Sequence, residues 1–279
     1  MTFFAPIVTI TWLTFHEARR RSMVLAAVLL GAAFLLLYGS GVWFVVQELA
    51  ERNAPALVSS QVYNLLTLAG LYVVHLIIVM LTIFAAVDTV AGEITSHTIQ
   101  TIVTRPLRRW HILLGKWLGF AGMLLLVLAL LAGGVLLLLG AIAGYTPPNA
   151  AAALGLLAVE ILVLLALSLL GGTQLSTLTN GVVLFMLYGL AFVGAWVEQV
   201  GAIVQSRAAV QLGIIASLLM PVEALWRRAA SLLQPPLAQA IPSPFSGVSV
   251  PSDAMVVYAM VYALVALTLA LHSFGRRDL

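Results

Sequence analysis

The sequence predicts an all-α polytopic membrane protein with six transmembrane helices. Hydrophobic residues occupy 62% of the 279 positions and charged residues only 8%, whereas soluble domains are roughly half apolar and roughly a quarter charged. The apolar residues are gathered in long runs, and the basic residues in short clusters between those runs. Such clusters are typical of membrane-flanking loops. Although the net charge is +3, the placement of the charges therefore indicates contact with membrane lipid and no binding of nucleic acid.

An interfacial helix is expected at the beginning of the chain, over residues 1–22. Apolar residues recur there at helical spacing at Ile7, Ile10, Leu13 and Phe15, and polar and basic residues stand behind them. A short helix with this pattern lies on the cytosolic surface of the membrane and leads into the first span.

Six apolar runs are long enough to cross a bilayer, which requires roughly 20 mostly apolar residues. The expected spans cover residues 23–46, 62–87, 117–143, 151–175, 182–200 and 255–274. Two Gly-x-x-x-Gly spacings, at Gly115 with Gly119 and at Gly140 with Gly144, are typical of close helix packing.

Residues 201–254 form a region outside the cytoplasm before the last span. The apolar run 208–219 is too short to span, and Pro221 interrupts it. Runs of that length are more often re-entrant or interfacial. The segment that follows carries Arg227 and Arg228 among leucine and tryptophan, which predicts an amphipathic helix at a membrane surface.

The orientation follows from the distribution of basic residues. With six spans both termini lie on one side, and nine of the 13 basic residues fall on that side. An excess of lysine and arginine marks the cytoplasmic face. The chain is therefore expected to be a multi-pass protein of the cell membrane with both termini in the cytoplasm.

Motifs for catalysis and for cofactors are missing from the sequence. There is no G-x-x-x-x-G-K-[ST] phosphate-binding loop, no H-E-x-x-H zinc motif and no cysteine. We therefore expect no enzyme activity from this chain alone, no metal site and no cofactor held by it.

The largest cytosolic connection, residues 92–116, lies between the second and third spans. One side of its predicted helix is apolar, through Ile99, Ile102, Val103 and Leu107. The other side is polar, through Gln100, Thr101, Thr104 and Arg105. Pro106 stops or kinks this helix. Such an element lies against the inner face of the membrane, where a soluble partner can push on it.

The same stretch resembles the signature of type-2 ABC exporter permeases. That signature has an acidic residue after the second span, a Gly-Thr-Leu-type turn, a short coupling helix, a proline, an arginine and Ile-Leu-x-Gly-Lys leading into the third span. The matching positions are Glu93, Thr98, Ile99, Pro106, Arg109, Ile112, Leu113, Gly115 and Lys116. His97 replaces the usual glycine, and Gln100 stands where an acidic residue is common. Within the family, Asp88 and residues 220–227 most resemble permeases of the nitrous-oxide-reductase maturation type.

The resemblance implies the permease subunit of an ATP-driven exporter in the cytoplasmic membrane of a prokaryote, with residues 1–279 as one transmembrane permease domain. Two copies, or one copy and a paralogue, would form the translocation path. Two copies of a separate ABC ATPase would bind ATP and Mg. The residues expected to contact that ATPase are Glu93, Thr98, Gln100, Thr101, Thr104, Arg105 and Pro106. Arg108, Arg109 and Lys116 are expected to anchor the segment at the anionic inner leaflet.

Two ionisable residues lie deep in predicted spans. Glu160 is about nine residues from the outer end of the fourth span, and a charge at such depth costs roughly 2.5–3.5 kcal/mol. It therefore faces the translocation path, or it is a neutral acid hydrogen-bonded between helices. His75 lies in the middle of the second span with no evident carboxylate partner, which favours a helix contact over a proton relay. Both are candidates for the translocation path.

Three other classes of protein are alternatives to an ATP-driven permease. A secondary transporter predicts internal repeats and interrupted helices, and no repeat between the halves is visible. An intramembrane enzyme predicts a cluster of polar residues at membrane depth, whereas the sequence displays one glutamate and one histidine far apart. A scaffold without transport activity is the remaining alternative.

Overall fold

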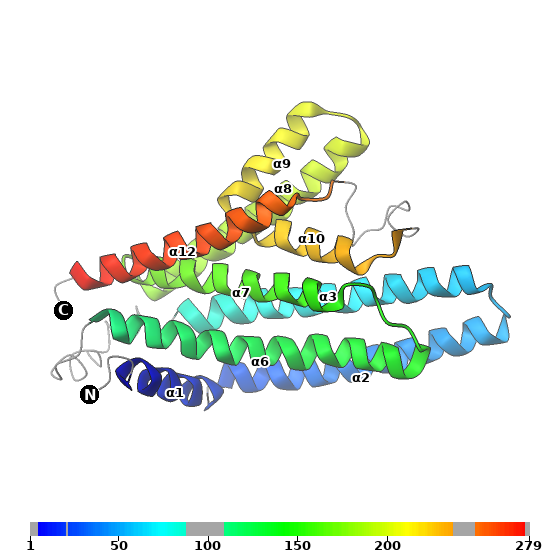
Figure 1. Cartoon of the computed structure of the whole chain (residues 1–279), viewed down its shortest axis with the longest axis horizontal. Helices are drawn as coiled ribbons and strands as arrows, with labels where there is room; N and C mark the ends of the chain where they lie inside the picture. The colour runs from blue at the N-terminus through cyan, green and yellow to red at the C-terminus, as the bar shows by residue number, and fades with distance from the viewer. Residues whose placement is uncertain (1–4, 21, 88–108, 237–248, 277–279) are drawn as a thin grey trace.

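The computed structural model describes residues 5–20, 22–87, 109–236 and 249–276, and this part of the chain contains helices and no strand. Figure 1 shows their arrangement. The helices are α1 (Ala5–Arg20), α2 (Ser22–Glu51), α3 (Ala56–Val87), α6 (Arg109–Ala143), α7 (Ala150–Gly172), α8 (Thr177–Ile203), α9 (Arg207–Leu219), α10 (Val222–Leu233) and α12 (Asp253–Arg276).

Six of these helices are long and apolar enough to cross a membrane: α2, α3, α6, α7, α8 and α12. The predicted fold class, an all-helical chain with six spans, is confirmed. Several helices extend beyond the apolar runs that predicted them, because polar residues continue the helix past the hydrocarbon. At the end of α2, for example, Glu48 and Arg52 form an ion pair of 2.6 Å at the i,i+4 spacing.

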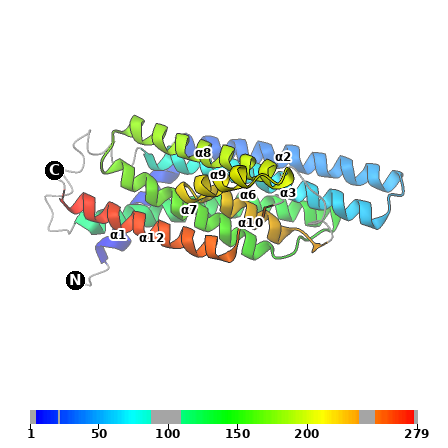
Figure 2. The same cartoon turned by 90° about the horizontal axis from the view of Figure 1, so that it is seen from above.

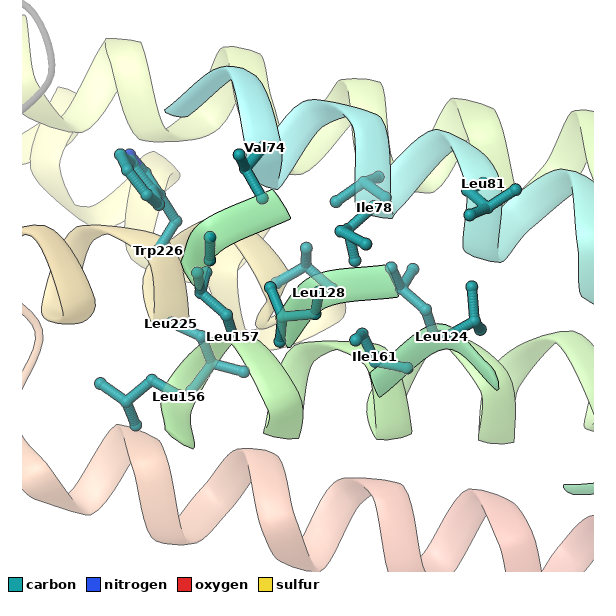
Figure 3. Close-up of a cluster of buried hydrophobic side chains, with 14 of the residues drawn as sticks. Val74, Ile78, Leu81, Leu124, Leu128, Leu156, Leu157, Ile161, Leu225 and Trp226 are labelled. Atoms are coloured by element: carbon teal, nitrogen blue, oxygen red, sulfur yellow. The ribbon is translucent and has the colours of Figure 1, made fainter. Parts of the chain in front are cut away.

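The helices α2, α3, α6 and α7 run side by side as a bundle. The described beginning of α1 and the end of α12 lie at the same end of it, next to the end of α3 and the beginning of α6 (Figures 1 and 2). Figure 3 shows side chains of α3, α6, α7 and α10 meeting in one core. Its labelled residues are Val74, Ile78, Leu81, Leu124, Leu128, Leu156, Leu157, Ile161, Leu225 and Trp226.

The helices α8 and α9 form a hairpin that tilts away from this bundle (Figure 1). Small residues bring the two backbones together: a Cβ built on Gly201 would lie 2.7 Å from the Cβ of Ala209. A bend of 106° then separates α9 from α10. Pro221 stands at this bend, and its missing N–H cannot continue the hydrogen bonds of α9. The expected bent pair before the last span is therefore present.

The burial of α10 differs from what its sequence suggested. An amphipathic helix at a membrane surface exposes one face, yet nine of the twelve residues of α10 are buried. The helix packs against α7, α8, α12 and α3. Its buried charged side chains, Glu223 and Arg227, are turned toward other helices of the protein, so the amphipathic pattern marks a polar interior contact here.

The two glycine pairs behave differently. Gly115 and Gly119 let α1 pack directly on α6, because a Cβ on Gly119 would lie 2.7 Å from Thr14 Cβ and 2.9 Å from Thr11 O. Close packing is confirmed there. It is wrong for Gly140 and Gly144, where no side chain of another helix comes within 4 Å. Gly144 instead ends α6 with a φ of +63°, the left-handed turn that favours glycine.

Candidate functional site

Three ionisable side chains meet where α10 packs against α3 and α7, each from a different helix. His75 lies on α3, Glu160 on α7 and Glu223 on α10. The imidazole Nδ1 of His75 is 2.8 Å from Oε1 of Glu160. Its Nε2 is 3.5 Å from Oε2 of Glu223. The exposed fractions of the three side chains are 0%, 1% and 6%, so this His75–Glu160–Glu223 cluster is closed to solvent.

Aromatic side chains surround the imidazole of His75. The hydroxyl of Tyr188 on α8 lies 3.3 Å from Nε2. The rings of Trp226 and Tyr72 stack on His75 with centroid distances of 5.1 Å and 5.8 Å. Aromatic faces carry partial negative charge and attract cations. The rings can therefore stabilise a positive charge on the imidazole, which offsets part of the cost of burying that charge.

The expectation that His75 and Glu160 are isolated is wrong. Each lies mid-span on its own helix, and only the packing of α3 against α7 brings them together. Sequence analysis also missed Glu223, Tyr188 and Trp226. One signal was available: Glu223 and Arg227 are charged residues one turn apart in a segment that is otherwise largely apolar.

A second buried ionic group lies beside the first. Nη2 of Arg227 donates to Oε2 of Glu198 on α8 at 2.9 Å and to Oγ of Ser217 on α9 at 3.2 Å. The hydroxyl of Ser249 donates to the other oxygen of Glu198 at 2.6 Å. This Arg227–Glu198 group ties α10 to α8, to α9 and to the segment before α12. A third contact, between Arg228 and Asp253 at 2.5 Å, is exposed to solvent.

The geometry of the cluster suits a proton better than a metal ion. No three His, Asp or Glu side chains in the described ranges are arranged to hold a metal. Both nitrogens of His75 already have protein groups within 3.5 Å. A buried imidazole between two carboxyls can hold positive charge, and it can share protons with both of them.

The expected contacts with an ATPase fall on residues 93–106, which lie outside the described residues, as does Arg108. Arg109 begins α6. Lys116 is also on α6, and its side chain is buried, with 6% exposed, whereas a residue that reaches lipid headgroups is expected to be exposed. The anchoring role of these basic residues stays a prediction.

The cluster is relevant to the alternative that the chain is an intramembrane enzyme, because such an enzyme is expected to have clustered polar residues at membrane depth. Such residues are present. Glu160 and His75 are nonetheless almost fully buried, so a substrate does not reach them in this conformation.

A family model described as "ABC-2 family transporter protein" matches residues 8–279. The match includes every described helix apart from the first residues of α1, and it takes in all members of both buried ionic groups. No curated protein matches the sequence.

Proposed function

The chain belongs to the ABC-2 family of transporter proteins, and from this membership we propose that it is the permease subunit of an ATP-driven exporter. It is a multi-pass integral membrane protein with six membrane-length helices. The observation that carries the proposal is the family match over residues 8–279, which includes all six of those helices.

A separate ATPase supplies the energy. The sequence contains no phosphate-binding loop, so ATP and Mg bind to the partner, which is present in two copies. This permease pairs with a second copy of itself or with a paralogue to enclose the translocation path. The complex lies in the cytoplasmic membrane of a prokaryote with both permease termini in the cytoplasm, in keeping with the common location of the two described ends (Figure 1).

Residues 92–116 couple the ATPase to the spans. Glu93, Thr98, Pro106 and the polar side of the coupling helix contact the ATPase. The segment continues directly into α6, whose Gly115 and Gly119 lie against the backbone of α1. Because the two backbones are in direct contact at these glycines, a push on the segment moves α6 and α1 together. Arg108 and Arg109 hold it at the inner leaflet, each charge contributing about 1 kcal/mol, whereas Lys116 is buried.

Glu160 and His75 lie beside the translocation path. They are closed off by α10, which packs on α7 and carries Glu223 and Trp226 against His75. Movement of α10 would open the polar cluster to the path. A change between two arrangements of one packed element is what alternating access requires.

The test compares the chain alone with the chain co-expressed with candidate ABC ATPases. We expect no saturable ATP binding by the purified chain, and hydrolysis of ATP by a stable complex reconstituted into vesicles. Saturable ATP binding by the chain alone would contradict the proposal. Transport driven by an ion gradient in vesicles that contain only this chain would instead favour a secondary transporter.

A further inference from the structure

The charges of the His75–Glu160–Glu223 cluster do not balance when every group takes its ordinary state in neutral water. Two ionised carboxylates surround one imidazole. Even if the imidazole is protonated, the cluster therefore keeps one net negative charge. Uncompensated charge is costly in a buried site. Among the described residues, no lysine or arginine forms an ion pair with Glu160 or Glu223, and the nearby Arg227 is already paired with Glu198.

The other titratable groups around the cluster do not supply the missing charge. Tyr72 on α3 and Tyr188 on α8 are neutral phenols at ordinary pH. In the core of Figure 3, the side chains that α6 places next to Ile78 of α3 are Leu124 and Leu128, which carry no charge. The tyrosines of α12 that face α9 donate to backbone carbonyls of that helix. On α2, Tyr38 donates to the backbone carbonyl of Leu66.

Two carboxyl oxygens of the cluster point to the same conclusion. Oε1 of Glu160 and Oε2 of Glu223 are buried, and neither has a hydrogen bond of good geometry from the described residues. Buried acceptors are normally satisfied. A buried oxygen without a hydrogen bond costs less on a neutral carboxyl than on a carboxylate, and one added proton also brings the cluster to zero net charge.

We propose that His75, Glu160 and Glu223 form a proton-binding site, and that α10 binds one proton when it packs into the bundle and releases it when it leaves. In the packed state the site holds an imidazolium, one carboxylate and one protonated carboxyl. When α10 moves away, Glu223 enters water and ionises. The remaining pair of His75 and Glu160 is neutral, so one proton goes to solvent.

The size of the effect follows from linkage. If packing of α10 takes up one proton, its equilibrium constant falls up to tenfold for each unit rise in pH, over the range where the site loses that proton. The site therefore makes the position of α10 sensitive to pH. This inference holds whether or not ATP drives the chain.

Thiol accessibility tests the movement of α10. The chain has no cysteine, so Ala230→Cys gives a single thiol on α10 at a position that is 0% exposed. Its labelling rate is measured against pH in this chain and in the same chain with Glu223→Gln. Thiolate formation raises both rates equally with pH, so their ratio isolates the site. We expect the labelling rate of the chain with Glu223, divided by the rate of the chain with Glu223→Gln, to rise by up to tenfold for each unit rise in pH. The reason is that glutamine has no proton to lose.

A matched control separates proton release from general loosening. Glu198→Gln weakens the other buried ionic group of α10 without touching His75. With Ala230→Cys it should raise labelling by a constant factor and leave the pH dependence as in the parent chain. A ratio that stays flat with pH while the protein remains folded would overturn the proposal.

Infrared spectroscopy in an ester-free detergent detects the protonated carboxyl group directly, and it does not require an introduced cysteine. The unsubstituted chain should show the carbonyl band of a protonated carboxyl group at neutral pH. Either Glu160→Gln or Glu223→Gln should remove that band, because one imidazolium neutralises the single carboxylate left. Glu48→Gln, at an exposed carboxyl, should leave it unchanged. A band missing from the unsubstituted chain, or one that survives both substitutions, would overturn the proposal.

Discussion

Glu223 and Arg227 lie one turn apart on α10, and they are paired with opposite partners in two different buried groups. Glu223 is 3.5 Å from the imidazole of His75, and Arg227 is 2.9 Å from the carboxylate of Glu198. A short helix is thereby attached to α3 through one residue and to α8 through the other. The position of α10 depends on both contacts, in addition to the apolar contacts of Leu225 and Trp226 (Figure 3).

Breaking the Arg227–Glu198 pair should destabilise the protein strongly. Both side chains are 5% exposed, and Arg227→Met leaves a buried carboxylate without its partner. We expect a loss of about 3–5 kcal/mol in the free energy of unfolding, measured by denaturant titration in detergent. The double substitution of Arg227→Met with Glu198→Leu should recover most of this loss, because an apolar pair has no charge to compensate.

The exposed pair of Arg52 and Glu48 is the control for that prediction. Its side chains are 74% and 57% exposed, so Arg52→Met should change the free energy of unfolding by at most about 1 kcal/mol. Equal losses from Arg52→Met and Arg227→Met would contradict the assignment of a buried ionic group to α10.

The contact between α1 and α6 is predicted to tolerate no side chain at Gly119. A Cβ there would lie 2.9 Å from the backbone oxygen of Thr11, so Gly119→Ala must displace α1. We expect a loss of about 1–3 kcal/mol in stability. Gly133 lies on the same helix with nothing within 4 Å, and Gly133→Ala should be neutral or stabilising by up to about 1 kcal/mol. Thermal unfolding of both variants, compared side by side, decides the point.

The six spans could be predicted because the signal for a span is local. Each contains enough consecutive apolar residues to cross a bilayer, and the length of such a run does not depend on the rest of the chain. Helix ends were less accurate, since hydropathy reports the part in the hydrocarbon and not the polar turns beyond it. The α9–α10 bend was also predictable, because Pro221 interrupts a run already too short to span.

The site could not be predicted in full because its contacts are not local. The pattern of α10 is the same whether its charged face meets headgroups or the carboxylate and imidazole of other helices. Similarly, the spacing of Gly115 and Gly119 equals that of Gly140 and Gly144, yet only the first pair faces another helix. The pairing of His75 with Glu160 depends on the register of α3 against α7, which no feature of either segment determines.

The orientation of the chain is predicted to place the segment before α12 outside the cell and the end of α12 inside. Single cysteines introduced as Val250→Cys and Gly275→Cys test this, because both positions are exposed. An impermeant thiol reagent applied to intact cells should label the first and spare the second. Disruption of the cells should then make both reactive. Labelling of Gly275→Cys in intact cells would place the terminus outside and reverse the assignment.

The coupling role of residues 92–116 gives the last prediction. Thr101 lies on the polar side of the predicted helix, so Thr101→Glu should place a charge against the ATPase without disturbing the apolar core. We expect loss of transport-linked ATP hydrolysis in the assembled complex, with thermal stability unchanged. Ile102→Ala, on the apolar side, should instead reduce stability, by about 2–5 kcal/mol where the side chain is fully buried.

Thr179 provides a matched control on the short connection between α7 and α8, which the sequence also places on the cytoplasmic side. It is exposed, and its backbone N–H donates to Ser176, the residue that caps α8. Thr179→Glu therefore adds the same charge at a position where Ser-x-x-Glu forms a favourable capping box. If only Thr101→Glu uncouples the complex, the effect belongs to the coupling helix, because charge, substituted residue and side of the membrane are the same. If ATP hydrolysis stays coupled to transport to the same extent in both variants, residues 92–116 only connect two spans and have no coupling role.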